Sequence, residues 1–176
     1  MTAVQQPGRI VCGVNGSSSS RRALGEAVRR AAASGERVTV VTAYDEVGYF
    51  WGAVASLPWG DHLPTPDHDV IRRAEEATLR HFVESVLSDP RCVPAGARRS
   101  VAIEVLAVPG HPVDVLVRES DGADVLVVGH GEEKGPLTSV AMGCSRRARC
   151  PVVVVPLGSF DAEPGPMARG LHTDER

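Results

Sequence analysis

The chain has little of what marks several large classes of protein. Only 4% of its residues are aromatic, its formal net charge is −3, and its apolar runs are short. A nearly balanced charge gives no reason to expect binding to nucleic acid or to an anionic membrane surface. The short apolar runs argue against a transmembrane helix. No charged segment followed by an apolar one opens the chain, so we expect no signal peptide and a cytoplasmic location.

The cysteines lack the spacing of a metal site or a redox motif. They form neither a C-x-x-C pair nor a Cys/His ligand pattern. We expect reduced thiols with a structural, buried role. The four residues concerned are Cys12, Cys92, Cys144 and Cys150.

The length of 176 residues suits one well-buried core and is short for two. We predict a single domain over residues 1–157. Residues 158–176 are rich in proline, glycine and charge and have no apolar periodicity, so they are predicted to form a disordered tail.

Apolar periodicity predicts a regular alternation of strands and helices. The predicted helices begin near Ser17, Asp67, Pro112 and Ser139, and the first three carry an apolar stripe. The order βαβαβαβαβ with short right-handed crossovers indicates an α/β fold: an open five-stranded parallel sheet with helices on both faces. The predicted strands cover residues 9–14, 37–43, 101–107, 125–128 and 152–155.

The last two predicted strands carry the strongest signal. The runs 125–128 and 152–155 are continuous and apolar without alternation, which is typical of strands covered on both faces. The first of them ends in Gly129-His130-Gly131. Glycines at the carboxyl end of such a strand expose backbone N–H groups and leave room for a phosphate. The pattern therefore predicts a small nucleotide-type binding domain.

Three segments together resemble the universal stress protein family over about residues 8–156. They are the first strand and its turn (Ile10 to Ser17), the start of the third helix (Gly110 to Leu116), and the final strand-loop-helix-strand unit from Ala123 to Val154. The resemblance implies the strand order 3-2-1-4-5. It also implies a homodimer formed along Val152–Val155.

The ATP-binding branch of that family has the pattern G-x2-G-x9-G-[ST], and this chain departs from it. The loop after Gly129 is about four residues too short, and Thr138 stands in place of the final glycine. Glu132 and Glu133 add charge that repels a phosphate unless a divalent cation intervenes. Asn15 replaces the family's acidic residue near the ribose and metal. Asparagine can hydrogen-bond a ribose hydroxyl but is a poor metal ligand.

The resemblance implies weak binding of ATP or AMP at the carboxyl edge of the sheet, and it leaves Mg²⁺ open. No catalytic residue and no metal ligand is predicted. The glycines have an equally good reading as turn residues, and Thr138 and Ser139 as helix caps. The predicted nucleotide-binding residues are Gly13, Asn15, Ser17, Val41, Val128, Gly129, Gly131, Gly135, Thr138, Ser139 and Val140.

Two functions are compatible with these patterns. The first is a stress-responsive, non-catalytic adenine-nucleotide-binding module, with slow hydrolysis of a bound nucleotide as its only conceivable chemistry. The alternative is a structural or regulatory homodimer of the same fold that has lost the nucleotide and acts through protein contacts. An aromatic-rich segment after the second strand, from Tyr44 to Trp59, could cover an adenine or pack against the sheet edge or a partner subunit.

Overall fold

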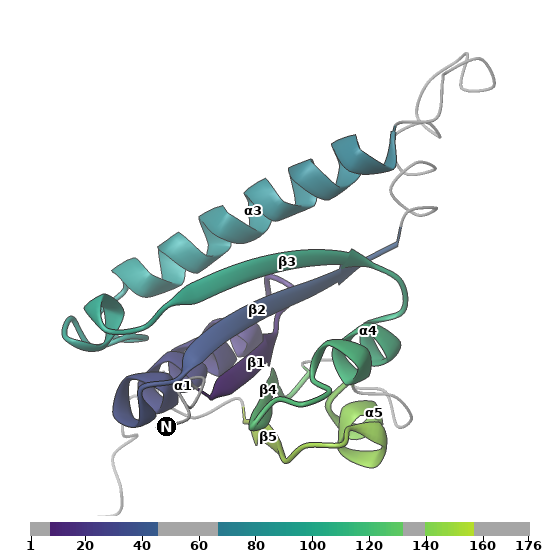
Figure 1. Cartoon of the computed structure of the whole chain (residues 1–176). Coiled ribbons are helices and arrows are strands. Elements are labelled where there is room, and N and C mark those ends of the chain that lie inside the picture. The colour runs from purple at the N-terminus through teal and green to yellow at the C-terminus, as the bar shows by residue number, and fades with distance from the viewer. Residues whose placement is uncertain (1–7, 46–66, 132–139, 157–176) are drawn as a thin grey trace, which may run out of the picture.

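The computed structural model describes residues 8–45, 67–131 and 140–156. Five parallel strands form one sheet in the order β3-β2-β1-β4-β5, which confirms the predicted topology (Figure 1). The strands are β1 (Arg9–Gly13), β2 (Arg37–Tyr44), β3 (Ile103–Pro109), β4 (Val125–Gly129) and β5 (Val152–Val155).

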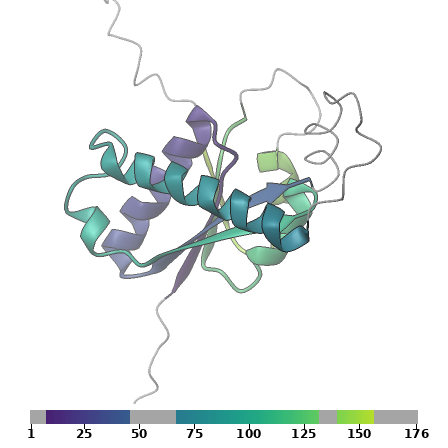
Figure 2. The ribbon, with the colours of Figure 1, turned by 90° about the horizontal axis from the view of Figure 1, so that it is seen from above.

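Helices cover both faces of this sheet (Figure 2). Helices α1 (Ser18–Ser34) and α3 (His68–Ser88) pack on one face, and α4 (Pro112–Glu119) and α5 (Val140–Arg147) pack on the other. The short 3-10 helix η2 (Ala97–Arg99) lies between α3 and β3. In the described ranges no helix is long and apolar enough to cross a membrane.

The continuous apolar runs divide between two cores. Along β1, Ile10 and Cys12 are buried against α1 and α3, whereas Val11 between them is buried against α4 and α5. Successive side chains of a strand point to opposite faces, so a strand without polar alternation needs cover on both sides. The structure provides that cover for β4, where Val127 is buried on one side and Leu126 and Val128 on the other, but only in part for the edge strand β5, where Val154 is 36% exposed.

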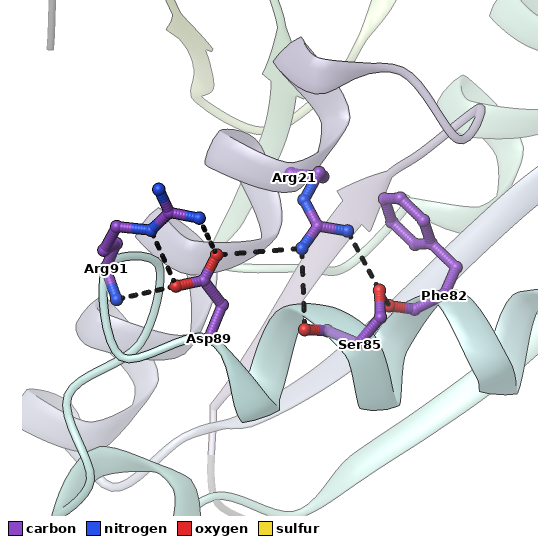
Figure 3. A network of polar contacts seen from close by, with 5 residues as sticks. All are labelled: Arg21, Phe82, Ser85, Asp89 and Arg91. Carbon is purple, nitrogen blue, oxygen red and sulfur yellow. Dashed lines mark hydrogen bonds and ion pairs between the residues drawn. The ribbon is translucent and has the colours of Figure 1, made fainter. Parts of the chain in front are cut away.

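A polar network holds the carboxyl-terminal end of α3 against α1 (Figure 3). Arg21 donates to the hydroxyl of Ser85 at 2.9 Å, and its guanidinium lies 3.9 Å from Asp89 and 6.0 Å from the ring centroid of Phe82. The carboxylate of Asp89 also accepts from the backbone N–H of Arg91 at 3.0 Å and from its guanidinium. One carboxylate therefore links α1 to the turn after α3.

The contacts of Asp89 in this network predict that the protein loses stability as the pH falls. Hydrogen bonds from the Arg91 side chain and backbone lower the pKa of Asp89 below its ordinary value. A depressed pKa in the folded state stabilises the protein above the unfolded-state pKa of about 3.9 and loses that contribution as the pH falls below it. Asp89→Asn should therefore lower the unfolding midpoint at pH 7 and flatten its fall in acid. Chemical unfolding from pH 7 to pH 3 checks this, with Glu84→Gln, an exposed carboxyl on the same helix, as the matched control. Equal acid profiles for wild type and Asp89→Asn would contradict the prediction.

Candidate functional site

The strand order reverses between β1 and β4, and the candidate site lies at that point. From β1 the chain crosses to β2 on one side, and from β4 it crosses to β5 on the other. Gly13 is paired with Val128, so the segments that follow both strands emerge side by side at the carboxyl edge. In open α/β sheets ligands bind in the crevice at this switch point.

A serine-rich turn connects β1 to α1. Gly16 has φ 81°, a left-handed conformation that favours glycine. Ser17 is the N-cap of α1, and its hydroxyl accepts from the backbone N–H of Ser20 at 3.2 Å. The hydroxyl of Ser17 also lies 2.9 Å from that of Ser19 and 3.1 Å from that of Ser20. These serines cap and close the first turn of the helix.

The same turn fixes the orientation of the Asn15 side chain. Its Oδ1 accepts from the Ser20 hydroxyl at 2.5 Å and from the backbone N–H of Ser17 at 3.3 Å. A backbone N–H can only donate, so the amide oxygen, and not the nitrogen, must face Ser17. Asn15 is exposed, and its Nδ2 is therefore the group that can reach a ligand. It offers donors where a carboxylate would offer acceptors.

Close packing against α1 explains why position 129 is glycine, and the sequence did not show this contact. A Cβ at this position would lie 2.7 Å from the backbone carbon and oxygen of Ser19 in the first turn of α1. Its φ is not positive, so the reading of Gly129 as a glycine required by a tight turn does not apply. The next residue, His130, donates its backbone N–H to the carbonyl of Val155 at 2.8 Å, and its ring Nδ1 lies 3.1 Å from the carbonyl oxygen of Gly131.

Three other predicted residues lie at the paired ends of β1, β2 and β4. Val41 and Val128 are buried in the core formed with α4 and α5. A Cβ on Gly13 would lie 2.7 Å from a methyl group of Leu116 on α4. Their side-chain positions are thus occupied by packing. Val14, directly after β1, donates its N–H to the Val41 carbonyl at 2.9 Å, which ties the ends of β1 and β2 together.

Helix α5 begins at Val140, directly after the segment predicted to hold phosphates. The first N–H groups of a helix have no acceptor within it, and the helix dipole favours an anion there. The predicted site residues Gly135, Thr138 and Ser139 lie outside the described residues, as do the acidic pair Glu132–Glu133 and the aromatic segment after Asp45. The phosphate-binding role of that loop stays a prediction.

A cavity of about 130 Å³ adjoins the site on the face of the sheet that α1 and α3 cover. It lies between helix α3 and the ends of β1 and β2. We call it the α3-face cavity. Thr42 is next to the predicted site residue Val41, but none of the α3 residues was predicted. Glu75 precedes Leu79 and Phe82 by four and seven positions, which puts a carboxylate on the apolar stripe of the helix and could have signalled the cavity. The lining residues are Val14, Asn15, Gly16, Thr42, Glu75, Thr78, Leu79 and Phe82.

Among the described residues no group of three or more His, Cys, Asp or Glu side chains is placed to hold a metal ion. Burial raises the pKa of the Cys12 thiol to about 12 and that of Cys144 to about 11, so both stay protonated at neutral pH. What the geometry offers is backbone N–H groups, an oriented amide and hydroxyls, which suit binding.

The family model described as the universal stress protein family matches residues 7–156. The chain belongs to the universal stress protein family. No curated protein matches it. Among solved structures, a universal stress protein in complex with cAMP is 28% identical, with a TM-score of 0.57 over 84% of this chain and 95% of that one.

Two further members share the fold at lower identity. A universal stress protein from Archaeoglobus fulgidus in complex with dAMP is 22% identical, with a TM-score of 0.51 over 84% of this chain and 97% of that one. A family protein from Arabidopsis thaliana with AMP bound is 20% identical, with a TM-score of 0.55 over 91% of this chain and 98% of that one.

Proposed function

We propose that this universal stress protein is a non-catalytic adenine-nucleotide-binding module. The observation that carries the proposal is that the Asn15 turn after β1 and the Gly129–Gly131 segment after β4 follow paired strand ends at the switch point of the sheet. Helix α5, which begins at Val140, follows the second of these segments in the chain. A family member 28% identical to this chain binds cAMP. Relatives with the same fold hold dAMP and AMP.

In this proposal Asn15 contacts the ribose and the phosphate lies at the start of α5. The N–H groups of Gly131, Ser139 and Val140 would donate to the phosphate, since the N–H of His130 is already bonded to Val155. Because Asn15 offers its amide nitrogen, this position does not supply a metal ligand. Affinity would therefore not depend on Mg²⁺ at this residue.

The test is binding by the purified native protein. Mass spectrometry under native conditions should detect a retained adenine nucleotide, and titration calorimetry with AMP should give a saturable heat with one site per chain. GMP is the matched control for recognition of the base. If no adenine nucleotide is retained and none gives a heat, the proposal is refuted, and the alternative of a module that acts through protein contacts is favoured.

Both the nucleotide-binding proposal and the alternative of a module that acts through protein contacts include a homodimer. The edge position and partial exposure of β5 support such a dimer. This strand pairs with β4 and forms one edge of the five-stranded sheet. Val153 and Val155 pack against the core with α1 and α3, whereas Val154 is 36% exposed. An apolar, partly exposed edge strand is a surface that proteins usually cover. We propose a second copy of the chain as its cover.

Val154→Lys should therefore shift the protein from dimer to monomer, since it places a charge on the exposed face of the edge without entering the core. Sedimentation velocity at micromolar concentration measures the change. Val70→Lys, at a site 58% exposed on α3, is the matched control and should leave the dimer intact. A wild-type protein that sediments as a monomer would contradict the prediction.

A further inference from the structure

The α3-face cavity contains a carboxylate that the fold does not use. Glu75 is half-buried, and within the described part of the chain it has no hydrogen-bond or ion-pair partner. Its neighbour Glu76 is paired with Arg72 at 3.6 Å and with Arg80 at 3.3 Å. A partly buried carboxylate is an acceptor of several hydrogen bonds and is costly to leave without donors. Glu75 thus lines the cavity as an acceptor to which no described residue donates.

Donors stand on the opposite wall of the same cavity. The Oδ1 atom of Asn15 is held by Ser17 and Ser20, which leaves the two N–H groups of its amide for a ligand. Thr42 adds a hydroxyl from β2. The hydroxyl of Thr78 is already committed, since it donates to the carbonyl of Ala74 at 3.0 Å. The cavity therefore presents acceptors on the α3 side and donors on the sheet side.

The remaining wall is apolar, and the space is small. Val14, Leu79 and Phe82 line it with carbon. A volume of about 130 Å³ is well below the roughly 300–1,000 Å³ that enclose a whole drug-sized ligand. It suits one ring of a larger molecule. A ring that fits this cavity would have two adjacent hydroxyls to donate to the Glu75 carboxylate and an ether or hydroxyl oxygen to accept from the Asn15 amide. Its C–H face would pack against the apolar side chains of the wall.

We propose that the α3-face cavity binds the ribose of the nucleotide, with Glu75 accepting from the 2′ and 3′ hydroxyls and Asn15 donating to a ribose oxygen. The inference rests on the proposed function and assigns a part of the same ligand. Asn15 belongs both to the cavity and to the turn that follows β1, whose last residue Gly13 pairs with Val128 beside Gly129, so the cavity adjoins the proposed nucleotide site. Glu75 then supplies from α3 the carboxylate that position 15 lacks.

Ribose-modified nucleotides test this assignment. Calorimetry compares AMP with 2′,3′-dideoxy-AMP in wild type, in Glu75→Gln and in Glu76→Gln, the adjacent carboxyl that is paired outside the cavity. Wild type should favour AMP by about tenfold or more, because hydrogen bonds to a charged acceptor are strong. Glu75→Gln should remove most of that preference by weakening AMP alone, and Glu76→Gln should keep it.

The outcomes separate the two proposals. An unchanged preference for AMP in a folded Glu75→Gln variant overturns the ribose assignment and leaves the nucleotide function standing. Failure of every adenine nucleotide to bind wild type refutes the proposed function. Titration of the protein with ribose 5-phosphate, followed by NMR, then tests whether the cavity binds a sugar. Shifts of the Thr42 amide and the Asn15 side-chain amide in wild type that are lost in Glu75→Gln support the sugar subsite. The absence of such shifts in wild type overturns it.

Discussion

Replacing Gly129 by valine should destabilise the protein by about 3 kcal/mol or more. The first atom added to Gly129 would lie 2.7 Å from the backbone carbon and oxygen of Ser19. Backbone atoms in the first turn of a helix cannot move aside as the end of a flexible side chain can. Either α1 shifts away from β4, or the β4–β5 ladder distorts at Gly129 and Val155.

Urea unfolding followed by circular dichroism measures this effect. Gly96→Ala is the matched control, because nothing lies within 4 Å of a Cβ there and the φ of Gly96 is −72°. Such a surface change should alter the free energy of unfolding by no more than about 0.5 kcal/mol. A valine variant as stable as wild type would show that α1 does not press on the end of β4. The prediction also means that lost nucleotide affinity in this variant would not by itself identify a phosphate contact.

The fold could be predicted because its signals are local. The apolar runs of β4 and β5 and the stripe of α1 each depend on residues close in sequence, and the sheet topology then follows from short connections and the family resemblance. The ends of the strands are the exception. Strand β3 was expected over residues 101–107 but runs from Ile103 to Pro109, since its pairing with β2 continues as far as Tyr44 and Pro109. Such register comes from the neighbouring strand and leaves no local pattern.

The site could be predicted only in part, for the same reason. The sequence places Asn15 and Gly129 at strand ends, and the structure confirms that position. It could not show that Gly129 meets Ser19, which is distant in the chain, or that Ser17 and Ser20 hold the Asn15 oxygen. These facts add a packing role for Gly129 and a fixed side-chain orientation for Asn15, and the ligand contacts of both residues stay predictions. The packing of Gly129 depends on which helix covers the end of β4, and apolar periodicity does not specify that.

The second large effect concerns the phosphates, where AMP should bind about as well as ATP. A loop about four residues short has fewer N–H groups to surround a triphosphate, and its sequence includes two acidic residues, Glu132 and Glu133. Each charge-assisted hydrogen bond is worth roughly 1.5–3 kcal/mol. Losing two of them removes about 3–6 kcal/mol, a hundredfold or more in affinity, from whatever the β and γ phosphates would otherwise add.

Titration calorimetry with AMP, ADP and ATP, with and without Mg²⁺, measures this directly. The double change of Glu132 and Glu133 to Gln should raise the affinity for ATP and leave that for AMP nearly unchanged, because repulsion grows with each phosphate. AMP thus acts as the internal control for folding and for adenosine recognition. A submicromolar ATP affinity that rises with every phosphate in wild type would show that the short loop still supplies the missing donors. In that case the protein would distinguish nucleotides by their phosphates. Equal affinities would mean that it recognises the adenosine alone, and Asn15 and the α3-face cavity are then the groups that can contact the adenosine.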